Sequence, residues 1–85
     1  MTGKHTITVE LQYFAQLREQ AGTGAERVKT SASSVAELYE ELRGKHGFTL
    51  PPQSLRAAVN AEFVAWHQAL SDGDAVVFIP PVSGG

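Results

Sequence analysis

The chain has 85 residues, of which 42% are hydrophobic and 19% charged, and its formal net charge at pH 7 is -2. This length suits one small domain with a modest core, and the apolar content is too high for intrinsic disorder. The slight negative charge argues against nucleic acid or a membrane surface as a partner, and no apolar run is long enough to span a bilayer. The absence of cysteine excludes disulfides, thiolate metal ligands and cysteine nucleophiles, and it fits a reduced, cytoplasmic location.

The N-terminal part predicts a strand, a short helix and a second strand. Residues 6–14 alternate between apolar and polar side chains, which is typical of a half-buried strand. Residues 14–21 have helical composition and end at Gly22, and residues 25–30 predict a weaker strand.

The clearest element is an amphipathic helix that begins after Ser34. Ser34 and Glu37 match a capping box, in which each side chain satisfies a free backbone N–H of the first turn. Gly44 or Gly47 ends the helix. The apolar stripe at helical spacing consists of Val35, Leu38, Tyr39 and Leu42.

The C-terminal half predicts short strands joined by turns. Two prolines place residues 48–55 in a loop, residues 56–60 predict a strand, and residues 60–62 predict a turn. Residues 75–79 predict the last strand. One long helix among several strands indicates an α+β domain with the helix packed across a single sheet.

No catalytic set is evident inside the domain. His5, His46 and His67 lack the spacing of metal ligands, so no metal site is predicted. Asp72 and Asp74 are interpreted as turn residues, because a calcium loop needs more oxygen ligands at alternating positions. The basic residues are scattered and are interpreted as solvated charges: Lys4, Arg18, Arg27, Lys29, Arg43, Lys45 and Arg56.

The C-terminal segment draws attention because residues 75–85 carry no ionisable side chain. The chain is therefore divided into a domain over residues 1–79 and a flexible Gly-Gly tail over residues 80–85, with the carboxylate of Gly85 as the candidate reactive group. A slim glycine pair can thread a narrow channel in another protein. A free carboxylate is a poor electrophile, so ATP must activate it, and the lack of a phosphate loop here assigns that step to a partner enzyme.

The last predicted strand is apolar on both faces. Val76, Phe78 and Pro80 would point to one side and residues 75, 77 and 79 to the other. A single helix covers only one face of a sheet. We therefore favour partner docking at this strand, with coverage by loops on both sides as the alternative.

Four segments carry a family resemblance: residues 14–19 (FAQLRE), 57–60 (AAVN), 70–74 (LSDGD) and 78–85 (FIPPVSGG). The chain resembles the small subunits of molybdopterin synthase, which are ubiquitin-like sulfur carriers of the β-grasp fold. The resemblance implies a mixed sheet with one main helix packed across it, and it spans nearly the whole chain.

The same resemblance implies a mechanism in which this chain is a non-catalytic sulfur donor that binds no cofactor itself. A ubiquitin-activating-type adenylyltransferase would use ATP and Mg to adenylylate Gly85, and a sulfurtransferase would convert it to a thiocarboxylate. The thiocarboxylate would then donate sulfur to cyclic pyranopterin monophosphate within a heterotetramer whose large subunit holds the catalytic residues. The implied tail is Pro80, Pro81, Val82, Ser83 and Gly84, ending at Gly85, and the implied partner interface is Phe14, Phe63, Phe78 and Ile79.

Two other functions share the activation step and stay open at this point. The chain could carry sulfur for another pathway, such as the thiamine one, or modify proteins by isopeptide bonds. An adaptor with an inert tail is the remaining alternative.

Overall fold

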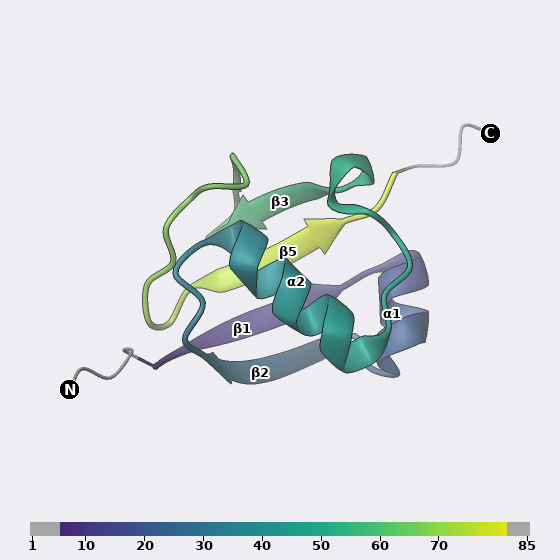
Figure 1. Ribbon diagram of the computed structural model, residues 1–85, viewed down its shortest axis with the longest axis horizontal. Helices are drawn as coiled ribbons and strands as arrows, with labels where there is room; N and C mark the ends of the chain where they lie inside the picture. Colours follow the sequence, from purple (N-terminus) through teal and green to yellow (C-terminus); the bar gives the residue numbers. More distant parts are fainter. Residues whose placement is uncertain (1–5, 82–85) are drawn as a thin grey trace.

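The chain folds as a five-stranded mixed sheet that is crossed on one face by a single long helix (Figure 1). The computed structural model describes residues 6–81. The elements in chain order are β1 (Ile7–Tyr13), α1 (Ala15–Ala21), β2 (Ala25–Thr30), α2 (Val35–His46), the short 3-10 helix η1 (Pro52–Ser54), β3 (Arg56–Val59), β4 (Glu62–Val64) and β5 (Ala75–Ile79). The predicted α+β arrangement is confirmed.

The strand order β2-β1-β5-β3-β4 places the last strand at the centre of the sheet. β5 pairs in parallel with β1 and antiparallel with β3. The parallel pairing sets Tyr13 opposite Phe78, so β1 and β5 finish at the same end of the sheet. The segment after β5 therefore leaves from the middle of that end, which is also the end where α1 lies (Figure 1).

Helix α2 begins and ends as its sequence predicts. The Ser34 hydroxyl accepts a hydrogen bond from the Glu37 N–H at 3.2 Å, while the Glu37 carboxylate accepts one from the Ser33 N–H at 2.9 Å. Gly47 ends the helix at φ 72°, a left-handed conformation that suits glycine, and its N–H donates to the Arg43 carbonyl. All four residues of the predicted apolar stripe are fully buried against the sheet.

Aromatic rings fill the space between α2 and the sheet. The Tyr39 ring lies 5.1 Å from Phe78, 5.8 Å from Trp66 and 5.9 Å from Phe48, centroid to centroid. Such contacts add to the large apolar area that each ring buries. The rest of the core includes Val9, Leu11, Leu38, Leu42 and Val76 from β1, α2 and β5, with further residues from α1, β2 and β3.

The turns at the end of the sheet opposite the tail use polar side chains for structure. Asn60 and Ala61 both have positive φ, as a two-residue turn between antiparallel strands requires. The Asp74 carboxylate accepts from the Asn60 side chain at 3.0 Å and from the Ser71 N–H at 2.8 Å. Asp72 accepts from the Thr8 N–H at 2.8 Å. The interpretation of both aspartates as turn residues is confirmed.

The helices of residues 6–81 include none with the length and apolar character that crossing a membrane demands.

Candidate functional site

The candidate site is the end of the sheet from which the predicted tail departs. β5 ends at Ile79, and the partly exposed Pro80 and exposed Pro81 follow it outside the sheet. Both prolines have a fixed φ and no N–H to donate, so they end strand pairing and stiffen the exit. The predicted reactive residues Gly84 and Gly85, with Val82 and Ser83, lie outside the described residues.

Beside this exit, the sheet face opposite α2 carries an apolar patch, which we call the docking face: Ala58, Phe63, Val77 and Ile79. Strand register joins these residues, because Ala58 pairs with Val77 on one side and with Phe63 on the other. Phe63 is 62% exposed, and Val77 and Ile79 are partly exposed. No helix covers this face in Figure 1.

Phe14 stands at the same end of the sheet. It directly follows β1, and its carbonyl accepts hydrogen bonds from the Leu17 and Arg18 N–H groups as the N-cap of α1. The backbone of Phe14 is thereby fixed while its ring remains 44% exposed. A large exposed apolar ring held on a rigid backbone suits contact with another protein.

Phe78 requires a correction. It was predicted to be an interface residue, but its side chain is 0% exposed. The register explains the error, because Phe78 lies opposite Tyr13 and Ala57, which both face the core. Of the four predicted interface residues, the structure exposes Phe14, Phe63 and in part Ile79, and it places Phe78 beneath α2.

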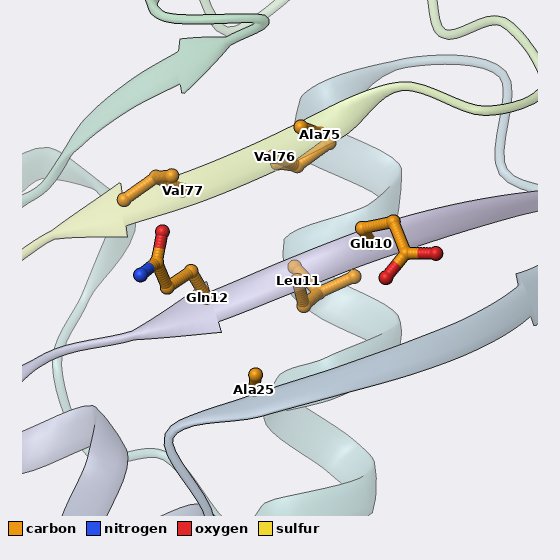
Figure 2. A pocket seen from close by; sticks show the side chains of 7 residues that line it. All are labelled: Glu10, Leu11, Gln12, Ala25, Ala75, Val76 and Val77. Atoms are coloured by element: carbon orange, nitrogen blue, oxygen red, sulfur yellow. The ribbon is translucent and has the colours of Figure 1, made fainter.

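The other half of the open face carries the polar side chains of β1 and holds a shallow groove that is lined mainly by apolar residues (Figure 2). Figure 2 views β1 and β5 from the side opposite α2, with Glu10 and Gln12 along β1 and Val77 on β5. Glu10 accepts a hydrogen bond from Arg27 Nε at 2.8 Å, and both side chains are exposed. An exposed pair of this kind contributes little to stability, but it gives the negative charge of Glu10 a positive partner.

Arg56 is a feature of the docking face that sequence reasoning missed. Its guanidinium carbon lies 4.5 Å from the centre of the Phe63 ring, a cation–π arrangement. Arg56 is also the register partner of Ile79 and therefore adjoins the tail exit. Spacing along the chain gave no sign of this, because the sheet pairing brings residues 56, 63 and 79 together.

A partly buried polar cluster supports the same end of the sheet from the core side. The Glu26 carboxylate accepts hydrogen bonds from Tyr13 Oη at 2.6 Å and Lys45 Nζ at 3.2 Å, and it lies 2.7 Å from His46 Nε2. Burial raises the pKa of Glu26, but the hydrogen bonds from these three groups outweigh burial and hold it below its usual value. Burial, with the bond to Glu26, raises the pKa of Tyr13 far above its usual value. The cluster joins β1, β2 and the end of α2.

The sheet order, the single crossing helix and the central C-terminal strand define a ubiquitin-like protein of the β-grasp fold. The chain belongs to the ThiS family, whose model matches residues 11–85. It is 36% identical over 80 residues to a molybdopterin synthase sulfur carrier subunit of Escherichia coli K12, which covers 91% of this chain and 99% of the relative. The resemblance to this group of sulfur carriers is thereby confirmed.

Solved structures agree with this placement. A protein described as molybdopterin converting factor subunit 1 of Pyrococcus furiosus is 31% identical with a TM-score of 0.76, covering 89% of this chain and 99% of that one. A chain in a complex of subunits 1 and 2 of molybdopterin-converting factor from Helicobacter pylori matches at 28% identity with a TM-score of 0.63. The match covers 93% of this chain and 100% of that one. Small archaeal modifier protein 1 of Haloferax volcanii matches at 26% identity with a TM-score of 0.75, and the match covers 89% of this chain and 99% of that one.

Proposed function

We propose that this chain is the sulfur-carrier subunit of a molybdopterin synthase and that Gly85 carries the sulfur. The sequence similarity to the Escherichia coli protein and the structural similarity to the Pyrococcus furiosus protein support this assignment, and the family match extends through Gly85. A Gly85 thiocarboxylate would donate sulfur to cyclic pyranopterin monophosphate, and two such donations build the dithiolene of molybdopterin.

The chemistry divides the work between this chain and its partners. An adenylyltransferase joins the Gly85 carboxylate to AMP and releases pyrophosphate from MgATP, which creates a mixed anhydride with a good leaving group. The persulfide of a sulfurtransferase then attacks the acyl carbon and displaces AMP. A thiol reductant cleaves the S–S bond of the resulting acyl disulfide, which leaves the thiocarboxylate and regenerates the sulfurtransferase thiol. This chain supplies only the carboxylate and a surface that each enzyme recognises, as expected for a carrier working in the reduced cytoplasm.

The observation that carries the proposal is the position of the exit from β5. The central strand ends at Ile79, Pro80 and Pro81 follow it, and exposed Phe14 and the docking face lie at the same end of the sheet. A partner that rests on this face is held at the root of the tail, so its pocket can receive residues 82–85. The Helicobacter pylori complex of subunits 1 and 2 supports a large subunit as that partner, and we expect two large and two small subunits per synthase.

Intact mass spectrometry tests the proposal. The chain is incubated with the adenylyltransferase, MgATP and a sulfurtransferase with its sulfur donor, and its mass should rise by the exchange of one oxygen for sulfur. A variant lacking Gly85 is the control and should keep its original mass. An unmodified wild-type chain, beside a relative that the same enzymes convert, would count against sulfur carriage.

The likeness to small archaeal modifier protein 1 favours protein modification as a second candidate. Both functions begin with an adenylylated glycine and differ in the acceptor. Conjugates of the chain on lysines of other proteins, rather than a free thiocarboxylate, would support this second function. A carrier of the thiamine pathway would form the thiocarboxylate but would not convert cyclic pyranopterin monophosphate.

A further inference from the structure

Beside the docking face lies a positive charge, that of Arg56, which no carboxylate of residues 6–81 neutralises. Arg56 is exposed, and its guanidinium lies over the Phe63 ring, which supplies no hydrogen-bond acceptor. Within residues 6–81, no carboxylate comes within ion-pair distance of this side chain. Its five N–H donors therefore have no acceptor that the structure shows among residues 6–81.

The arrangement of the strands explains why no acid reaches Arg56. Glu62 lies opposite Val59, whose side chain faces the core, so Glu62 projects to the other side of the sheet from Phe63. Glu10 lies on the open face, but Arg27 already binds it across the β1–β2 pair. Arg56 is thus a fixed positive charge in an apolar surface.

Docking of a partner on this face would remove water from Arg56. Burying an unpaired guanidinium is strongly unfavourable, whereas a carboxylate that accepts two of its N–H groups offsets the loss of hydration. The Phe63 ring lies against the guanidinium and restricts its position, and it leaves the N–H groups without an acceptor. The surface therefore fits an apolar partner patch with one acidic residue.

We propose that Arg56 is a specificity-determining residue, which selects a large synthase subunit bearing a carboxylate at the entrance of the channel that receives the tail. This inference rests on the proposed function. The position follows from register, because Arg56 pairs with Ile79, the residue just before the two prolines. A carboxylate bound to Arg56 would fix the partner at the tail root and so set the entry of Gly85.

Binding of the large subunit from the same organism tests the proposal. Dissociation constants are measured by calorimetry at low and high NaCl for the wild type, Arg56→Gln and Arg56→Lys. Lys29→Gln is the matched control, because it removes the same charge from the same sheet face, opposite Thr8 on β1. Thermal unfolding of each variant confirms that the fold is intact.

Arg56→Gln should weaken binding at least about tenfold at low salt, with a flatter salt dependence, and Arg56→Lys should recover part of the loss because it keeps the charge. Lys29→Gln should stay within about twofold of the wild type. Equal affinity of Arg56→Gln and the wild type, or equal weakening by Lys29→Gln, would overturn the role of Arg56 while leaving sulfur carriage intact. A wild-type chain that does not bind the large subunit at all would overturn both proposals.

Discussion

Truncation of two phenylalanines separates the core of this domain from its docking face. Phe78 is 0% exposed and contacts Tyr39 and Trp66, with ring centroids 5.1 and 5.8 Å away. Replacing a buried phenylalanine by alanine costs about 3–5 kcal/mol, from lost burial and from the cavity left behind. A domain of 85 residues has a free energy of unfolding of about 4–13 kcal/mol, so Phe78→Ala removes a large part of it.

Phe63→Ala is the matched control, because it makes the same chemical change at a side chain that is 62% exposed. It should cost about 1 kcal/mol or less, including the loss of the contact with Arg56. Phe63→Ala should instead weaken binding of the large subunit, because its ring lies on the docking face.

Thermal unfolding by circular dichroism measures both variants. For a domain of this size, about 1 kcal/mol corresponds to roughly 4–8 °C in the melting temperature, so Phe78→Ala should melt at least about 12 °C below the wild type. Phe63→Ala should lie within about 8 °C of it. A Phe78→Ala variant that has the same melting temperature as the wild type and loses only partner binding would refute the assignment of Phe78 to the core.

Three further variants test the polar contacts. The carboxylate of Glu26 has a lowered pKa in the folded protein, so the stability that it contributes is present above its usual value of 4.5 and is lost as the pH falls below that value. The difference in urea midpoint between the wild type and Glu26→Gln should therefore become smaller in acid. A difference that is constant with pH would show that the ionised carboxylate of Glu26 is not the source of this stability. Tyr13 has a raised pKa, so its contribution is fully present below pH 10, and the wild type should lose stability relative to Tyr13→Phe above pH 10 in urea titrations. Ser34→Ala should lower the free energy of unfolding by about 1 kcal/mol, because the Glu37 N–H loses its acceptor, and an unchanged urea midpoint would argue that water replaces the cap.

Much of the fold follows from local sequence patterns. The bounds of β2 and β5 are those that the sequence predicts, and Ser34 and Gly47 enclose α2. These signals are local, because capping residues and apolar spacing depend on neighbours within one or two turns.

The faces of β5 could not be assigned in the same way. Both faces of this strand are apolar, so alternation alone does not tell which one α2 covers. Only the pairing of Phe78 with Tyr13 decides the matter, and that contact joins residues 65 positions apart. For the same reason, Arg56 was interpreted as a solvated charge although it adjoins Ile79.

The polar cluster around Glu26 was also beyond the reach of sequence reasoning. Tyr13, Glu26 and His46 come from three separate elements and show no motif spacing. The spacing of His46 argues against a metal site but gives no sign of its contact with Glu26, where the structure places it partly buried.

Transfer of labelled sulfur tests the central claim most directly. The chain is loaded at Gly85 with isotopically labelled sulfur, mixed with the large subunit and cyclic pyranopterin monophosphate, and the pterin product is analysed by mass spectrometry. We predict labelled dithiolene from the wild type and none from a variant lacking Gly85, whose melting temperature should be unchanged because the core of residues 6–81 ends at Phe78. Labelled product from the shortened chain, or unlabelled product from the loaded wild type, would contradict the account.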